Sequence, residues 1–219
     1  MKASIVSLTP ARGGSKGMKR KNLYPVNGKP LLYYVLTALE NSGVDERWVS
    51  TDDTEIAAVA ESYGARVIRR PAEMALDTSP SEEALLHFAD HVNFDFLIFA
   101  QNTSPFLLPR DIAEGLRMMR SGRYDSVFTA TKEHWLPRWN TDATPHEWDP
   151  FQRPRRQDMP ERFVENGMFY ITSRAELLTF RCRYSGRRGI VEIPLMRSFQ
   201  IDTYDEIEMI ECLMRGMAK

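Results

Sequence analysis

The chain has few of the residues from which disulfide frameworks and metal clusters are built. Its 219 residues include two cysteines, Cys182 and Cys212, and four histidines. One widely separated cysteine pair cannot form a disulfide framework, and it lacks the spacing of a metal site. The two thiols fit a reducing compartment, and we expect a cytoplasmic protein.

The chain also lacks a strong net charge and any long uncharged apolar run. Its 29 lysines and arginines balance 30 acidic residues, which leaves a formal net charge of −1. No overall basic field would attract nucleic acid or an anionic membrane, and no segment is apolar over the length of a bilayer. We therefore expect neither a nucleic acid nor a membrane as a partner.

What is present is the composition of an ordinary globular protein. Hydrophobic residues make up 42% of the chain and charged residues 27%. A length of 219 residues suits one good-sized domain better than two large ones. The sequence therefore predicts a single domain over residues 1–219.

Short apolar runs alternate with segments of helical periodicity along the chain. After the run at residues 3–8, apolar residues recur at helical spacing in residues 30–39. This alternation predicts an α/β fold of three layers, in which helices cover both faces of a mostly parallel sheet. Strands are expected near residues 3–8, 47–50, 66–68, 94–100, 126–130, 167–172 and 190–193, and helices beginning near residues 30, 56, 79, 112 and 203.

Two of the helix starts show a capping pattern. Ser79 suits an N-cap, Pro80 suits the first turn, and Glu82 would complete a capping box. Thr203 and Glu206 repeat the pattern before the last helix. The sequence therefore predicts that these two helices are capped by Ser79 and Thr203.

The alternation stops between residues 132 and 160. This stretch contains Trp135, Trp139 and Trp148 among prolines and arginines, and it is too aromatic for a disordered linker. Its apolar side chains would be exposed on a single chain. We expect a small inserted arm over residues 132–160 that packs on a second copy, so that the protein is a homodimer.

Glycines and cations gather directly after the first predicted strand. Residues 11–22 read Ala-Arg-Gly-Gly-Ser-Lys-Gly-Met-Lys-Arg-Lys-Asn. Glycines let backbone N–H groups approach an anion, and five cations would balance a triphosphate. The segment fits neither the P-loop nor the dinucleotide-binding pattern, which argues against a kinase-like ATPase and an NAD enzyme. Its place at the end of a strand predicts a phosphate site.

The same segment resembles the signature of the CMP-sialic acid synthetases, also called acylneuraminate cytidylyltransferases. Five further stretches agree in the same order along the chain: Val-Ser-Thr-Asp at 49–52, Asp-Thr-Ser-Pro-Ser at 77–81, Gln-Asn-Thr-Ser-Pro at 101–105, Arg-Pro-Arg-Arg-Gln-Asp at 153–158 and Glu-Asn-Gly at 165–167. Six motifs in register make the resemblance specific. It implies a nucleotide-diphospho-sugar transferase-like fold, and it implies transfer of CMP from CTP to the anomeric hydroxyl of a sialic-acid-like nonulosonic acid.

The resemblance also assigns residues to the parts of a site. Catalysis would depend on Arg12, Lys21 and Asp202; the nucleotide would be bound by Arg12, Gly13, Gly14, Ser15, Lys16, Asn22 and Ser81; the sugar would be bound by Gln101, Arg155, Gln157 and Asn166. An arginine suits a sugar carboxylate because its planar fork binds two oxygens. From the residues alone, Ser81, Gln101 and Asn166 also fit ordinary turn positions, and the arginines near residue 155 also fit a solvated stretch.

The end of the chain departs from the family's metal pattern. The family usually places two aspartates, one residue apart, before the last helix to hold Mg²⁺. Asp202 is present here, whereas Gln200 replaces the other aspartate and offers only a neutral carbonyl oxygen. Mg²⁺ also uses phosphate oxygens and water, so we expect Mg²⁺, with Mn²⁺ as an alternative, on Asp202. Asp205 is a weaker candidate for a second carboxylate.

Three functions stay open at this point. The first is CMP transfer to a sialic-acid-like acceptor, and the second is the same chemistry on legionaminate, pseudaminate, deaminated neuraminate or octulosonate. The third, suggested by Gln200, is a nucleotide-binding protein that has lost catalysis. No residue of the sequence is identified as a general base.

Overall fold

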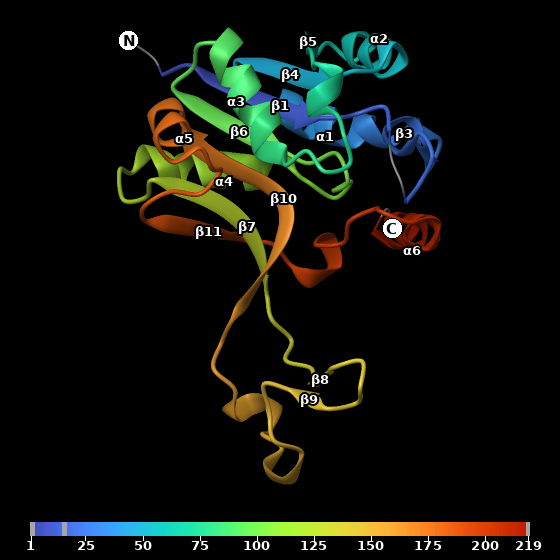
Figure 1. Ribbon diagram of the computed structural model, residues 1–219, viewed down its shortest axis with the longest axis vertical. Coiled ribbons are helices and arrows are strands. Elements are labelled where there is room, and N and C mark those ends of the chain that lie inside the picture. Colours follow the sequence, from blue (N-terminus) through green and yellow to red (C-terminus); the bar gives the residue numbers. More distant parts are fainter. Residues whose placement is uncertain (1–2, 15–16, 218–219) are drawn as a thin grey trace.

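The computed structural model describes residues 3–14 and 17–217. Within these ranges a seven-stranded sheet has the strand order β11-β7-β10-β6-β1-β4-β5 (Figure 1). Only β10 runs antiparallel to its neighbours, β6 and β7, which confirms the predicted mostly parallel sheet. The strands are β1 (Ile5–Pro10), β4 (Glu46–Thr51), β5 (Arg66–Arg69), β6 (Phe96–Ala100), β7 (Ser126–Lys132), β10 (Phe163–Ser173) and β11 (Arg188–Glu192), and a separate pair is formed by β2 (Pro25–Val26) and β3 (Lys29–Pro30).

Helices cover both faces of this sheet, as predicted. They are α1 (Leu31–Glu40), α2 (Thr54–Ser62), α3 (Ser81–His91), α4 (Pro109–Arg120), α5 (Arg174–Phe180) and α6 (Tyr204–Met217). Buried side chains of α1, α2, α4 and α6 join one hydrophobic cluster, and those of α3 and α5 join another. Within the described residues, no helix is both long enough and apolar enough to cross a bilayer.

The two clusters lie on opposite faces because strand residues alternate. In β6, Ile98 belongs to the first cluster, whereas its neighbours Leu97 and Phe99 belong to the second. In β10, Ile171 and Tyr170 divide in the same way. A sheet buried on both faces explains why its strands appear in the sequence as nearly continuous apolar runs.

The start of α3 differs from the prediction. Its N-cap is Pro80, which offers no side-chain hydrogen bond, and the helix begins at Ser81. The Ser79 hydroxyl donates instead to the carbonyl of Glu73 at 3.3 Å, and Glu82 forms an ion pair with Arg183. The predicted capping box at Ser79 is therefore wrong, because a distant arginine takes the glutamate that would have completed it.

The start of α6 agrees better with the sequence. One carboxylate oxygen of Glu206 accepts hydrogen bonds from the backbone N–H groups of Asp202 and Thr203, at 2.6 and 2.7 Å. This is the glutamate half of the predicted capping box. It fixes the backbone of Asp202 directly beside the helix start.

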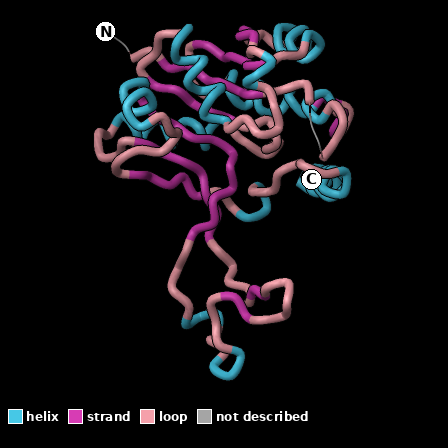
Figure 2. Tube along the Cα trace, viewed as in Figure 1, coloured by secondary structure: helices cyan, strands magenta, loops and turns pink. Residues whose placement is uncertain are grey.

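Residues 133–162 leave the sheet between β7 and β10 and extend away from the rest of the chain (Figure 1). Figure 2 shows that this extension is mostly loop. It contains the short pair β8 (Arg138–Trp139) and β9 (Pro145–His146), and the rings of Trp139 and Trp148 meet edge to face with centroids 5.0 Å apart. The side chain of Phe151 is 94% exposed. A role for this extension in dimerisation stays a prediction.

Candidate active site

Three parallel strands end beside one cavity of about 280 Å³. Pro10 ends β1, Arg70 follows β5 and Gln101 follows β6, and all three residues contribute to its wall. Open α/β sheets bind their ligands at this carboxyl edge. The cavity brings together six residues that were predicted from the sequence: Arg12, Lys21, Asn22, Ser81, Gln101 and Asp202.

Arg12 joins the glycine-rich loop to the segment before α3. One guanidinium nitrogen donates to the carbonyl of Leu76 at 2.6 Å, and another lies 2.6 Å from a carboxylate oxygen of Asp77. The backbone carbonyl of Arg12 accepts a hydrogen bond from the Asn22 amide at 2.7 Å. Arg12 is thus held at the cavity wall through both its guanidinium and its backbone carbonyl.

Lys21 and Asp202 bring opposite ends of the chain together. The Lys21 Nζ atom lies 2.7 Å from Asp202 Oδ1. Beside this pair, Asn22 is buried and its side-chain oxygen accepts a hydrogen bond from Asn102. A cation and a carboxylate therefore line the same cavity, next to the hydrogen-bonded side-chain amides of Asn22 and Asn102.

The glycines of the loop have different roles. The N–H of Gly13 donates a hydrogen bond to the Asp52 carboxylate at 2.8 Å, so a protein group and not an open position faces this N–H. A Cβ added at Gly17 would lie 2.7 Å from the backbone oxygen of Asp202, so only glycine fits there. Gly14 is exposed, and the predicted site residues Ser15 and Lys16 lie outside the described residues.

Arg70 is a residue of the cavity wall that sequence reasoning missed. Its side chain is buried, and it donates to the hydroxyl of Ser50 at 3.0 Å and to the carbonyl of Ser50 at 2.9 Å. Burial lowers the pKa of this guanidinium from its usual range, against the opposing effect of Asp52. The signal was available, because Arg70 lies two residues after the strand predicted at 66–68, close to the carboxyl end of that strand.

The turn before α3 also contributes to the wall. Ser79, Pro80 and Ser81 contribute to the cavity, and the Phe99 ring of β6 lies in the wall with them. Ser81 is thus where the sequence predicted a residue that reads a base. Its position is set by the start of α3, which has no side-chain cap.

A second cavity, of about 440 Å³, adjoins the first at Gln101, which contributes to both. Asn166 lies in its wall, where its side-chain amide donates to the hydroxyl of Ser198 at 3.0 Å. The predicted sugar residues Gln101 and Asn166 are therefore neighbours. Among the described residues of this wall, Glu165 and Glu206 carry charge and there is no lysine or arginine.

Gln200 holds the irregular part of β10 at the second cavity. Its amide nitrogen donates to the carbonyl of Asn166, and its oxygen accepts from the Thr103 hydroxyl at 3.3 Å. Gly167 has a positive φ of 68°, and a Cβ there would lie 2.5 Å from the Gln200 amide nitrogen. Both the backbone conformation and this contact require glycine at 167.

The donors fit a metal ion only in part. Asp202 offers an exposed carboxylate beside Lys21, whereas both ends of the Gln200 amide already make hydrogen bonds. Within residues 3–14 and 17–217, no three histidine, cysteine or acidic side chains gather as a metal site. The arrangement fits an ion held by one protein carboxylate, with phosphate oxygens and water completing the shell.

Arg155 and Gln157 are not brought to either cavity within one chain. Both lie on the extension, and Arg155 forms an ion pair with Asp158 at 2.7 Å. Figure 1 shows this part of the chain well separated from the sheet. Their predicted role in binding the sugar therefore needs a second chain.

Comparison with known proteins identifies the family. Residues 6–215 match the family model described as cytidylyltransferase. The chain belongs to the cytidylyltransferase family. It is 38% identical over 185 residues to N-acylneuraminate cytidylyltransferase of Oncorhynchus mykiss, which covers 80% of this chain and 43% of the fish protein. This confirms the resemblance to the CMP-sialic acid synthetases.

Two further likenesses concern length and fold. The chain spans about half the length of the first curated relatives it matches. It also matches post-translational flagellin modification protein B of Campylobacter coli at 28% identity, over 97% of this chain and 96% of that protein. The solved structure of CMP:2-keto-3-deoxy-manno-octonic acid synthetase complexed with CTP has a TM-score of 0.76 at 21% identity, over 98% of this chain and 100% of that one. The fold of this cytidylyltransferase-family chain is therefore nucleotide-diphospho-sugar transferase-like, as predicted.

Proposed function

We propose that the chain transfers CMP from CTP to the anomeric hydroxyl of a sialic-acid-like nonulosonic acid and releases pyrophosphate. The observation that carries this proposal is the convergence of Arg12, Lys21 and Arg70 on one cavity that continues into a second at Gln101. Three cations suit a triphosphate, and an adjoining polar cavity suits a hydroxylated acceptor. The family of the chain supports the same reaction.

The first cavity would bind CTP. Arg12, Lys21 and Arg70 would hold the phosphates, while Ser81 and the turn before it would read the cytosine. Binding the phosphates would replace the carboxylate partner Asp77 at Arg12 by more highly charged oxygens. The Asn22 amide would keep the loop in place through its bond to the Arg12 carbonyl.

The second cavity would bind the sugar acid. Gln101 and Asn166 offer amide groups to its hydroxyls, and the missing cation would come from the extension of a second chain, which carries Arg155. Support for this homodimer comes from the exposed apolar side chains of the extension and from the acidic wall of the cavity. The partner would then complete the site with a group for the sugar carboxylate.

The chemistry needs positioning and charge neutralisation rather than a covalent intermediate. The anomeric oxygen attacks the α-phosphorus in line, the bond from that phosphorus to the bridging oxygen breaks, and pyrophosphate leaves with the electron pair while the hydroxyl proton passes to water or pyrophosphate. Arg12 and Lys21 would stabilise the negative charge that builds on the leaving oxygens. They would also hold two mutually repelling anions within reach of each other.

Asp202 would hold a divalent cation, Mg²⁺ or Mn²⁺, together with the phosphates. Such an ion supplies additional neutralisation of the triphosphate. Lys21 sits against the same carboxylate at 2.7 Å, so that the lysine and the aspartate would form one electrostatic unit.

The direct test is pyrophosphate release from CTP in the presence of Mg²⁺ and a panel of acids. We expect N-acetylneuraminate to consume CTP faster than octulosonate. The panel also includes legionaminate, pseudaminate and deaminated neuraminate, because each carries a carboxylate beside the anomeric carbon as N-acetylneuraminate does. Binding of CTP without turnover of any acid, with Mn²⁺ as well, would instead indicate a nucleotide-binding protein that lacks catalysis.

A further inference from the structure

An ion pair links the first turn of α3 to a loop about one hundred residues further along the chain. Arg183 donates from Nε to Glu82 Oε1 at 2.7 Å and from a terminal nitrogen to Glu82 Oε2 at 3.0 Å. The side chains are only 15% and 24% exposed. A two-pronged contact of this kind fixes orientation as well as distance.

Arg183 also rests on two aromatic rings of the sheet. Its guanidinium carbon lies 4.9 Å from the ring centroid of Phe99 and 4.9 Å from that of Tyr170. These two rings are themselves stacked, with centroids 5.5 Å apart. Since Phe99 belongs to the wall of the first cavity, the arginine connects that wall with the helix start through cation–π contacts.

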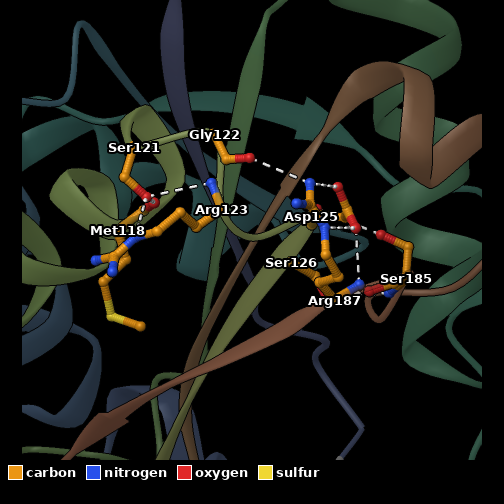
Figure 3. A network of polar contacts seen from close by, with 8 residues as sticks. All are labelled: Met118, Ser121, Gly122, Arg123, Asp125, Ser126, Ser185 and Arg187. Carbon is orange, nitrogen blue, oxygen red and sulfur yellow. Dashed lines mark hydrogen bonds and ion pairs between the residues drawn. The ribbon is translucent and has the colours of Figure 1, made fainter.

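The loop that carries Arg183 is anchored at its far end (Figure 3). Arg187 makes two side-chain hydrogen bonds to Asp125, at 3.0 and 3.1 Å. The Ser126 hydroxyl donates to the carbonyl of Ser185 at 2.8 Å and accepts from its N–H at 3.0 Å. Arg183 is thus presented from a loop tied to the start of β7.

Glu82, the partner of Arg183, lies at a helix start that no side chain caps. It follows Ser81, the last of the three turn residues in the cavity wall. The hydrogen bonds from Arg183 lower the pKa of Glu82 from its ordinary value, so this partner is charged at neutral pH. The ion pair therefore acts on the helix end next to the cavity.

We propose that Glu82 and Arg183 are positioning residues for the nucleotide cavity, which hold the turn of residues 79–81 against Phe99 so that it is preformed for the cytosine of CTP. The inference rests on the proposed function, and it assigns neither residue a contact with substrate. Without the ion pair, the turn would have to be ordered when the nucleotide binds. Each backbone residue ordered on binding weakens affinity by about tenfold.

The experiment is a calorimetric titration of CTP with Mg²⁺ into the full chain and its variants. We expect Arg183→Met and Glu82→Gln to weaken CTP binding by about tenfold, and Arg183→Lys, which keeps the charge but loses the fork, to weaken it less. The double variant should bind no worse than Arg183→Met, because the two residues act through one contact. Arg117→Met, which breaks an exposed pair with Glu114 on α4, is the matched control and should bind CTP as the wild type does.

Thermal unfolding of the same variants separates positioning from general stability. If Arg183→Met melts earlier but binds CTP with unchanged affinity when folded, the pair is merely structural and the proposal is overturned. If Arg183→Met does not fold, the same comparison of CTP affinity with melting temperature is made on Arg183→Lys and Glu82→Gln. A wild-type chain that binds no CTP would overturn the proposed function itself, whereas equal binding by wild type and variants overturns only this inference.

Discussion

At the scale of single residues, Gln200 stands where the family usually has a metal-binding aspartate, and here it makes structural hydrogen bonds instead. The amide bonds to the Asn166 carbonyl and to the Thr103 hydroxyl, so it joins the two cavities instead of adding a charge. We predict that Gln200→Ala raises KM for the sugar acid about tenfold, because the irregular part of β10 at Asn166 loses its support and leaves a buried carbonyl unpaired. KM for CTP, measured in the same assays, should change little, and an equal rise for both substrates would contradict this view.

At the scale of secondary-structure elements, one buried ion pair fastens the start of α4 to the segment that leads to Asp202. Arg197 and Asp111 are 9% and 7% exposed at their side chains. They share two hydrogen bonds, and Asp111 also accepts from the N–H of Leu108. Removing one partner of such a pair leaves a buried charge uncompensated.

We predict that Arg197→Met lowers the free energy of unfolding by about 3 to 5 kcal/mol. Arg117→Met, which breaks an exposed pair on the same helix, should leave stability nearly unchanged. Urea denaturation of both variants measures the difference. Equal midpoints for the two variants would show that the buried pair does not support the fold.

The anchored loop before β11 gives a pH dependence. Hydrogen bonds from Arg187 lower the pKa of Asp125 from 3.8 to about 2. A carboxyl whose pKa falls on folding contributes stability above its unfolded pKa and loses that contribution as pH falls through its folded pKa. The contribution of Asp125 is therefore complete above about pH 4 and is lost toward pH 2.

We accordingly predict that wild type and Asp125→Asn differ in melting temperature by a constant amount above pH 4. That difference should shrink between pH 4 and pH 2, because only the wild type loses the charged hydrogen bonds. Thermal scans at half-unit pH steps give the comparison. A difference that persists unchanged to pH 2 would mean that the Asp125 contact does not titrate in this window.

Most elements of the sheet were predictable because their apolar runs and periodicities are local. The errors came from contacts between distant residues. The helix expected to be capped by Ser79 begins at Ser81, since Glu82 is taken by Arg183. The antiparallel direction of β10 was not foreseen either, because a buried strand has the same apolar pattern in either direction.

The candidate site, like the fold, was predictable from the sequence only in part. Arg12 and Gln101 were assigned through the family resemblance, and their positions after predicted strands agreed with that assignment. Arg70 was missed although it follows a strand. Gln200 was noticed only as a departure from a pattern, because its bonds to Asn166 and Thr103 join segments that are far apart in the sequence.

At the scale of the whole molecule, the extension over residues 133–162 is the basis of the proposed dimer. Phe151 is 94% exposed there, and the second cavity has no cation among its described wall residues. We predict a dimer by light scattering in solution, and we predict that Phe151→Glu shifts it toward monomer and reduces turnover. Phe180→Glu, at a 55% exposed side chain on α5, is the control and should stay dimeric. A wild-type monomer with full activity would contradict the prediction.

We propose that the loop after β1 and the residues facing it hold a triphosphate for transfer of CMP. Lys21→Ala tests this role through its rate of pyrophosphate release from CTP and N-acetylneuraminate, compared with the rate of Lys29→Ala, whose lysine lies on β3 outside the cavity. Loss of one contact to the developing charge should slow Lys21→Ala by about a hundred- to a thousandfold, with the circular dichroism spectrum unchanged, while Lys29→Ala keeps the wild-type rate. Equal rates for the two variants would contradict a phosphate-binding role for Lys21.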